Sequence, residues 1–291
     1  MRIVYHLGVH CTDEERLLRC LLKNRAALAG EGIVIPGPAR YRTLLRDTAM
    51  QLRGQPASED TEALVLDQIM DEAVAERLIL SWDNFAGYAQ NALRGSQLYP
   101  GAAERLFAFA QVFPDIDCEF HMAIRNPATF LPAVYAKQKG RTLEEFTEGL
   151  DPLAVTWSDL IASIRIANPS VPITVWCDED TPLLWPEILR LVAGHSDLIE
   201  LLDADGVLAD IMRPEGLARM RAYLDERPPV DEDQRRRIVS AFLDKFARED
   251  AIDVEVEMPG WTPDLIARMT DAYDLDVARI LRMDGVRMIL P

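Results

Sequence analysis

The sequence predicts an α/β protein in which helices cover both faces of a P-loop-type parallel sheet, with a helical C-terminal region. Five short runs of β-forming residues alternate with segments of helical apolar spacing, and residues 181–291 show helical spacing alone. Strands that alternate with helices are typical of a parallel sheet buried on both faces. No Pro/Gly/Ser-rich linker divides the 291 residues, so we expect one domain, 1–291, with a helical extension at about 181–291.

The chain opens on a predicted βαβ unit. Residues 2–7, Arg-Ile-Val-Tyr-His-Leu, form the first strand, and leucines at 17, 18, 21, 22 and 28 mark one side of the helix that follows. Gly30 and Gly32 end this helix, and residues 33–35 form a second strand that Pro36-Gly-Pro38 closes.

The remaining elements follow from the same periodicities. Further strands are predicted at 77–81, 118–124 and 173–177, the last clear strand. Pro127 suits the first turn of a helix that Pro132 must kink or restart. The other helices are expected at 41–52, 59–75, from about 101, 157–167, 185–192, 215–224, 231–248 and 263–281.

Composition excludes several classes of protein. The formal charge of −17 argues against nucleic acid as the main partner, because phosphate backbones are bound by basic surfaces. The four cysteines are widely spaced and form no CxxC pair, which predicts reduced thiols rather than a zinc ribbon or disulfide framework. No stretch resembles a signal peptide or a bilayer-spanning segment, so we expect a cytoplasmic protein without membrane insertion. Its apolar helix faces could pack within the chain or between chains, which leaves an oligomer open.

Chemistry is expected in the loops that follow the predicted strands, because ligands bind at the carboxyl ends of strands in an open parallel sheet. These loops are 8–13, 81–85, 125–127 and 177–180, and each contains polar side chains. No His/Cys/Asp spacing is diagnostic of a metal site, and the carboxylates of Cys177-Asp-Glu-Asp180 are interpreted as a solvated turn.

The first loop has the position of a P-loop, directly after the first strand and before the first helix. It reads His-Leu-Gly-Val-His-Cys-Thr-Asp-Glu-Glu-Arg-Leu over residues 6–17, and Gly-Ile-Val-Ile-Pro follows at 32–36. In these residues the chain resembles the bacterial PAPS-dependent sulfotransferases, whose loop reads roughly His-Ile-Gly-x-x-Lys-Thr-Gly-Thr-Thr-x-Leu. The resemblance extends to the closing helix at 264–283. It implies a sulfotransferase-like P-loop fold with Gly8 and Thr12 in the donor site.

The departures from this pattern concern charge. Cys11 stands where the family has lysine, Asp13 where it has glycine, and Glu14 and Glu15 where it has hydroxyls. Two like charges about 4 Å apart repel by roughly 4 kcal/mol at an effective dielectric of about 20. The phosphate-binding motif is therefore degenerate, and PAPS is expected to bind poorly. An alternative is that Thr12 and Glu15 form a capping box that satisfies the helix N–H groups.

A second part of the resemblance is the segment Arg125-Asn-Pro and, further along, Tyr135. In the family these residues hold the ribose phosphate of the donor, so Arg125, Asn126 and Tyr135 are candidate binding residues, although Ala133 replaces the family's serine. An arginine can contact a phosphate as a planar fork. Alternatively, Arg125 pairs with a neighbouring Asp or Glu of this acidic chain.

Asp83 and His10 are the candidate catalytic residues. Asp83, or His10 or His121 if they converge, could act as the general base that deprotonates an acceptor hydroxyl. The alternative for Ser81 and Asp83 is that they cap a helix. His10 and Cys11 could form a reactive thiol pair if the helix N-terminus lowers the pKa of the thiol, an effect that the neighbouring glutamates oppose.

Two classes of function remain. The first is a non-catalytic descendant of the sulfotransferase-like fold, which binds an anionic nucleotide, another small molecule or a partner in the same cleft. The second is an active transferase that moves a sulfuryl group from PAPS to a hydroxyl acceptor. The acidic first loop favours the first class.

Overall fold

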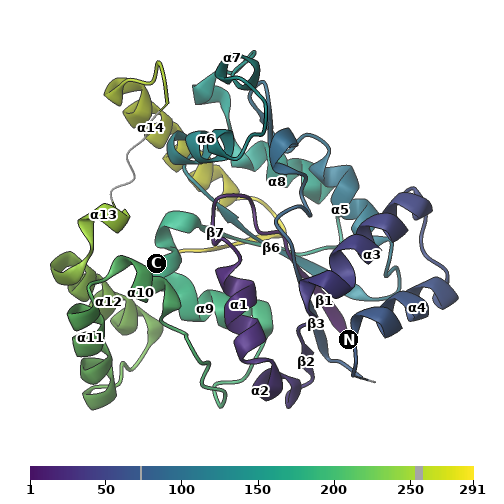
Figure 1. Ribbon diagram of the computed structural model, residues 1–291, viewed down its shortest axis with the longest axis horizontal. Helices are drawn as coiled ribbons and strands as arrows, with labels where there is room; N and C mark the ends of the chain where they lie inside the picture. Colours follow the sequence, from purple (N-terminus) through teal and green to yellow (C-terminus); the bar gives the residue numbers. More distant parts are fainter. Residues whose placement is uncertain (73, 253–257) are drawn as a thin grey trace.

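A six-stranded sheet lies at the centre of the computed structural model, which describes residues 1–72, 74–252 and 258–291 (Figure 1). All neighbouring strands are parallel, in the order β2-β3-β1-β6-β7-β8. The strands are β1 (Arg2–His6), β2 (Ile33–Val34), β3 (Arg77–Ser81), β6 (Asp117–Ile124), β7 (Ile173–Cys177) and β8 (Val286–Ile289). The predicted fold class and its five strands are confirmed, while β8 was not predicted. A short antiparallel hairpin, β4 (Leu93–Arg94) and β5 (Gln97–Leu98), lies apart from the sheet.

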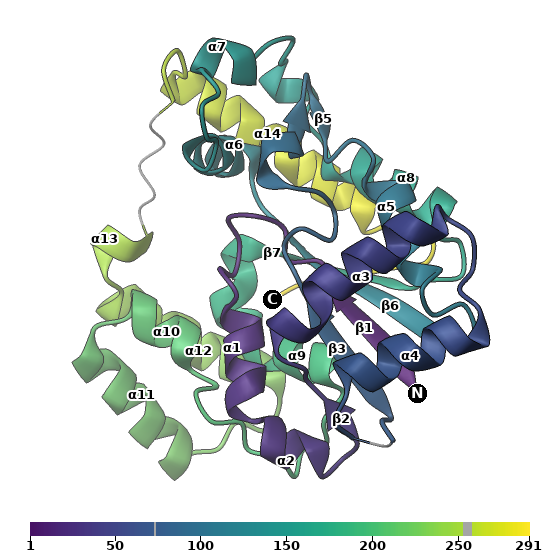
Figure 2. The ribbon, with the colours of Figure 1, turned by 45° about the vertical axis from the view of Figure 1, so that its right-hand side comes forward.

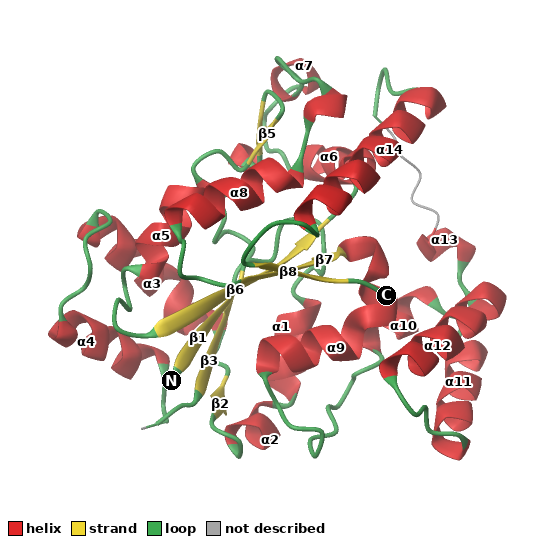
Figure 3. Cartoon of the chain, turned by 180° about the vertical axis from the view of Figure 1, so that it is seen from behind, coloured by secondary structure: helices red, strands yellow, loops and turns green. Residues whose placement is uncertain are grey.

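Helices cover both faces of this sheet (Figure 3). The first half of the chain contains α1 (Arg16–Lys23), α2 (Arg25–Ala29), α3 (Pro38–Leu52), α4 (Glu59–Ile69), η1 (Ala89–Asn91), α5 (Ala102–Ala110), α6 (Pro127–Ala136) and α7 (Leu143–Phe146). The second half contains η2 (Pro152–Ala154), α8 (Trp157–Ala167), η3 (Asp178–Asp180), α9 (Thr181–Ala193), α10 (Gly206–Ile211), α11 (Pro214–Glu226), α12 (Glu232–Phe246), α13 (Glu249–Ile252) and α14 (Pro263–Ile280).

The alternation of side chains along β1 shows how the sheet is buried. Ile3 and Tyr5 belong to the core beneath α3, α5, α6, α8 and α14, whereas Val4 belongs to the core beneath α1 and α9. All three side chains are fully buried. Successive strand side chains point to opposite faces, so a strand covered on both faces reads as a continuous apolar run.

Two predicted helices differ from the observed ones. The helix expected through Leu28 is divided at Asn24, whose Oδ1 accepts a hydrogen bond from the Leu202 backbone N–H at 2.7 Å and whose Nδ2 donates to the carbonyl oxygen of Cys20 at 2.8 Å. The helix expected over 59–75 ends at Ile69. Residue 73 of that prediction lies outside the described residues.

The topology identifies a switch point between β1 and β6. The chain leaves β1 towards β2 on one side of the sheet and leaves β6 towards β7 on the other. Adjacent strands whose connections diverge in this way open a crevice at their carboxyl ends, where ligands bind. Helices α10–α13 lie together beside α9 and α1 (Figures 1 and 2). Within the described residues, no helix combines the length and apolar character needed to cross a membrane.

Candidate functional site

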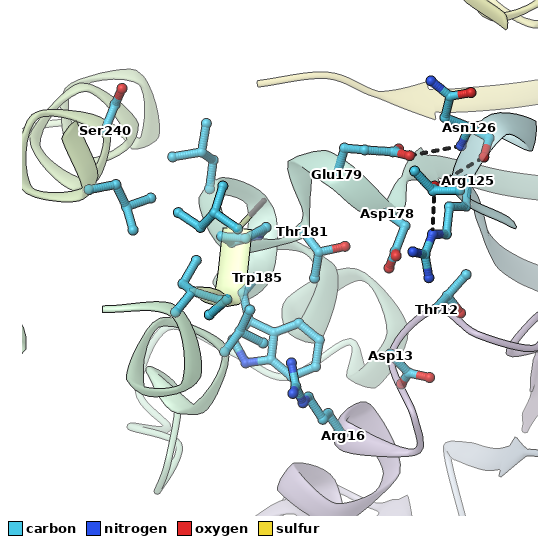
Figure 4. A pocket seen from close by; sticks show the side chains of 18 of the residues that line it. Thr12, Asp13, Arg16, Arg125, Asn126, Asp178, Glu179, Thr181, Trp185 and Ser240 are labelled. Atoms are coloured by element: carbon cyan, nitrogen blue, oxygen red, sulfur yellow. Dashed lines mark hydrogen bonds between the residues drawn. The ribbon is translucent and has the colours of Figure 1, made fainter. Parts of the chain in front are cut away.

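A cavity of about 760 Å³ lies at the switch point, between the loops that follow β1, β6 and β7 and helices α9, α10, α12 and α13 (Figure 4). We call it the cleft. One part of its wall is polar, and the other is largely apolar. Its lining residues are Thr12, Asp13, Arg16, Arg125, Asn126, Thr129, Asp178, Glu179, Thr181, Pro182, Leu183, Trp185, Val207, Ile211, Ser240, Leu243, Asp244, Ala251 and Ile252. Three predicted binding residues, Thr12, Arg125 and Asn126, therefore line one cavity.

Arg125 is held in the cleft by neutral partners. Its Nη1 donates a hydrogen bond to the carbonyl oxygen of Cys11 at 2.5 Å, and its Nε donates to Thr129 Oγ1 at 2.9 Å. The alternative of an ion pair is wrong, because no described carboxylate lies within 4.0 Å of the Arg125 guanidinium. The guanidinium thus joins the loops after β1 and β6. Its positive charge is not neutralised by an ion pair and faces the cleft.

Asn126 acts as a structural link in this position. Its Oδ1 accepts a hydrogen bond from the Ala128 N–H at 2.9 Å and caps α6, while its Nδ2 donates to Thr270 Oγ1 of α14 at 2.9 Å. The Asn126 backbone N–H donates to Glu179 Oε1 at 2.8 Å. Tyr135 lies elsewhere on α6, with its ring 5.2 Å from that of Phe146, and it is not among the cleft residues. Its role in binding stays a prediction.

Asp178 is the carboxyl group that the sequence reasoning missed. It begins η3 directly after β7, and burial raises its pKa from the usual value of 3.8 to about 7, although the Arg125 charge opposes this rise. The interpretation as a solvated turn is therefore wrong for Asp178. Sequence reasoning had placed this loop at the carboxyl edge of the sheet, which was the one available signal for its position in the cleft.

The first loop caps its own helix, but with a different residue from the one expected. The Asp13 carboxylate accepts hydrogen bonds from the backbone N–H groups of Glu15 at 3.3 Å and Leu17 at 3.1 Å, at the start of α1. The Thr12 hydroxyl instead donates to the Val9 carbonyl oxygen at 2.7 Å. The alternative of a Thr12–Glu15 capping box is wrong, because Glu15 has a left-handed backbone, with φ of 63°, and its side chain caps no N–H.

The two glutamates of this loop are paired with cations from distant parts of the chain. Lys137, which follows α6, lies 2.7 Å from Glu14, and Arg42 of α3 lies 2.7 Å from Glu15. Their carboxylates therefore carry less uncompensated charge at the loop than the sequence predicted. Neither cation was predicted, because each is distant from the loop in sequence and only the fold brings it there.

The candidate bases lie together, His10 in the first loop and Asp83 in the loop after β3. His10 Nε2 is 3.8 Å from Asp83 Oδ2 and 3.1 Å from Asn84 Oδ1, and His10 Nδ1 is 2.9 Å from the Tyr99 hydroxyl oxygen. His10 is only 4% exposed, and burial lowers its pKa. The helix-cap alternative is wrong, since no helix begins directly after Ser81 and its Oγ lies 2.8 Å from His6 Nδ1.

Two other hypotheses about this region concerned a reactive thiol and a metal site. Burial raises the pKa of the Cys11 thiol to about 11, so the helix end does not produce a reactive thiolate. Within the described part of the chain, no three His, Cys, Asp or Glu side chains are grouped so that they could hold a metal ion.

His121 does not converge with Asp83. It pairs in register with His6, and its Nε2 lies 2.9 Å from Glu119 Oε1. Both imidazoles are buried, and burial lowers the pKa of each from 6.5. His6 and His121 therefore belong to the interior of the sheet rather than to the cleft.

The buried pair predicts a loss of stability in mild acid. An unfolded chain whose histidines titrate near 6.5 takes up protons that the folded chain excludes, so the contribution of this pair to the free energy of unfolding is expected to fall as pH decreases below about 6.5. Urea titrations at a series of pH values between about 8 and 5 would measure this. A His6→Gln variant should show a shallower decline, and an identical slope in the variant would contradict the assignment.

Comparisons with known proteins add little to this geometry. No protein-family model matches the chain, and no curated protein matches its sequence. A crystal structure of a sulfotransferase from Alicyclobacillus acidocaldarius is similar at 12% identity and a TM-score of 0.39, over 82% of this chain and 97% of that chain. A likeness this distant assigns neither an activity nor a ligand to this chain.

Proposed function

We propose that the chain is a sulfotransferase-like protein that binds a small ligand in the cleft and does not hold PAPS in the usual way. The observation that carries this proposal is the Asp13 carboxylate at the N-terminus of α1, where it accepts hydrogen bonds from the N–H groups of Glu15 and Leu17. A helix N-terminus attracts an anion through these same groups and its dipole. A donor phosphate would have to displace a carboxylate that the chain itself supplies.

The space beside the loop supports the same proposal. The cavity between the first loop and Asp83 has a volume of about 30 Å³, whereas the cleft measures about 760 Å³. The space beside Asp83 therefore offers much less room for a ligand than the cleft does. The cleft falls in the range of about 300–1,000 Å³ that is usual for small-molecule sites.

The active transferase remains a second candidate because of the ion pairs at the loop. Lys137 and Arg42 compensate Glu14 and Glu15, and Arg125 has no carboxylate partner within 4.0 Å in the described ranges. An anionic donor could then lie against Arg125 and Lys137. Asp83 and His10, 3.8 Å apart, would supply the base that accepts the proton of the hydroxyl acceptor.

Thermal unfolding with PAPS and its desulfated product, PAP, separates the two candidates. We expect no rise in Tm at about 1 mM nucleotide, whereas a nucleotide present at 100 times its Kd would stabilise the chain by about 2.7 kcal/mol. An Asp13→Ser variant, which removes the carboxylate but keeps a capping oxygen, should gain stabilisation by PAP. Asp60→Ser, on an exposed first turn of α4, is the matched control.

A clear rise in the Tm of the unaltered chain with PAP would overturn the proposal and favour the transferase. Sulfuryl transfer from PAPS to a simple alcohol would then be measured in Asp83→Asn and His10→Gln variants. A loss of turnover at unchanged nucleotide affinity would identify the base.

A further inference from the structure

We propose that the ligand of the cleft is a small monocarboxylate with an apolar body, bound with its carboxylate between Arg125 and Asp178. This inference rests on the proposed function, because it names the chemical class that the cleft would take. It concerns the polar end of the cleft, where Arg125, Asp178 and Thr181 lie near one another in Figure 4.

Arg125 provides the cation for such a ligand. Its Nε and Nη1 are engaged by Thr129 and by the Cys11 carbonyl oxygen, and Nη2 has no hydrogen-bond partner among the residues that the structure describes. A half-buried guanidinium with no described carboxylate within 4.0 Å attracts an anion, and its planar N–H groups match a carboxylate. The two engaged nitrogens fix the direction in which the third can donate.

The charges around Asp178 limit the ligand to a single negative charge. The charged groups that act on Asp178 come from the first loop, α1, the loop after β6 and η3, and they are Asp13, Arg16, Arg125 and Glu179. Arg16 is already paired with Asp210 at 2.7 Å, and Asp244 of α12 also lines the cleft. A dianion would face several carboxylates and one unpaired guanidinium, so repulsion would exceed attraction.

Asp178, when protonated, can donate a hydrogen bond to the carboxylate of the ligand. Its pKa of about 7 lets it take up a proton near neutrality, and a protonated carboxyl group donates a hydrogen bond to a carboxylate. Thr181 adds a second, independent polar atom. It is 6% exposed, and its Oγ1 has no hydrogen-bond partner among the described residues. Buried hydroxyl groups are normally hydrogen-bonded, which indicates that a ligand group completes this site.

The opposite wall of the cleft accounts for the apolar body. It consists of aliphatic side chains from α9, α10, α12 and α13 together with one indole: Leu183, Trp185, Val207, Ile211, Leu243 and Ile252. Such a wall gains free energy by excluding water from a hydrocarbon surface. A ligand with one carboxylate and a short hydrocarbon chain could bind the polar wall through its carboxylate and the apolar wall through its chain.

Calorimetric titration of the full chain with sodium octanoate and with 1-octanol, at pH 6 and pH 8, tests the inference. Octanoate stays ionised over this range, whereas the protonated fraction of a group with a pKa of about 7 falls about tenfold. We expect the affinity for octanoate to be about tenfold higher at pH 6 than at pH 8, with proton uptake on binding. The affinity for 1-octanol should be lower and nearly independent of pH.

Three variants separate a ligand contact from a structural role. Asp178→Asn keeps a donor without a charge, so octanoate should bind it at pH 8 about as tightly as it binds the unaltered chain at pH 6. Arg125→Gln should lose at least about tenfold in octanoate affinity and little in octanol affinity. Arg19→Gln, on the exposed side of α1, is the control for overall charge and should change neither affinity.

Three outcomes would overturn the inference: no octanoate binding, equal octanoate affinity at the two pH values, or octanol binding as tight as octanoate. Tight octanol binding without PAP binding would leave the proposed function standing. Stabilisation of the unaltered chain by PAP would count against the proposed function itself, so the two failures are distinguishable.

Discussion

Replacement of Asp276 by alanine is expected to lower the free energy of unfolding by about 3–5 kcal/mol. Asp276 lies on α14 and is 2% exposed, and its carboxylate caps the N-terminus of α8. Its Oδ2 accepts hydrogen bonds from the N–H groups of Trp157 at 2.7 Å and Ser158 at 3.1 Å, and its Oδ1 accepts one from the Ser158 hydroxyl. The nominal cap of α8, Thr156, makes no side-chain cap bond, so alanine at 276 would leave buried donors without partners.

Urea denaturation of Asp276→Ala and Asp276→Asn measures this effect. Asparagine keeps an acceptor oxygen but loses the charge that favours the helix N-terminus, so we expect roughly half the loss. Asp274→Ala changes an exposed carboxylate on the same helix and should alter the free energy of unfolding by less than about 0.5 kcal/mol. A loss below about 1 kcal/mol for Asp276→Ala would contradict the assignment of this carboxylate as the cap of α8.

The same contact supports the cleft. Trp157, the first residue of α8, donates its indole N–H to the carbonyl oxygen of Arg125 at 2.8 Å. A shift of α8 would therefore move the backbone that carries the guanidinium. We expect Asp276→Ala to weaken ligand binding in the cleft as well as stability, although Asp276 is not among the residues that line it.

The sheet could be predicted from the sequence because its strands are buried on both faces. Such strands read as continuous apolar runs, as in residues 2–7 and 77–81, and they alternate with helical spacing. Strand β8 was missed because Val286–Ile289 lies at the end of a long helical segment and carries Arg287 between apolar residues. Its place at the edge of the sheet depends on pairing with β7, which local sequence does not specify.

The sequence predicted some of the residues that lie at the site, but not the charge balance or the burial of these residues. The loops at the carboxyl edge, together with the resemblance to the sulfotransferase motifs, indicated Thr12, Arg125 and Asn126, which the fold brings to one cavity. The charge balance could not be predicted, because Lys137 and Arg42 approach the first loop through tertiary packing. The raised pKa of Asp178 could not be predicted either, because the burial that causes it arises only when the chain folds.

Gly8→Ala is the second substitution from which we expect a large effect, a loss of about 2–4 kcal/mol in the free energy of unfolding. Gly8 has φ of +68°, and a Cβ at this position would lie 2.8 Å from the Cα of Asp83 and 3.2 Å from its backbone N. A left-handed backbone costs an alanine about 1–2 kcal/mol. The contact adds to this cost, because the atoms it meets belong to the backbone and cannot rotate away.

A comparison with Gly140→Ala isolates the contact from the backbone strain. Gly140 has φ of +76°, but an added Cβ would meet no atom within 4 Å, so this variant should lose only about 1–2 kcal/mol. The excess loss in Gly8→Ala then measures the close approach of the loops after β1 and β3, which also sets the 3.8 Å distance between His10 and Asp83. Equal losses in the two variants would show that the loops separate without cost. The proximity of the two candidate bases would then have no support from Gly8.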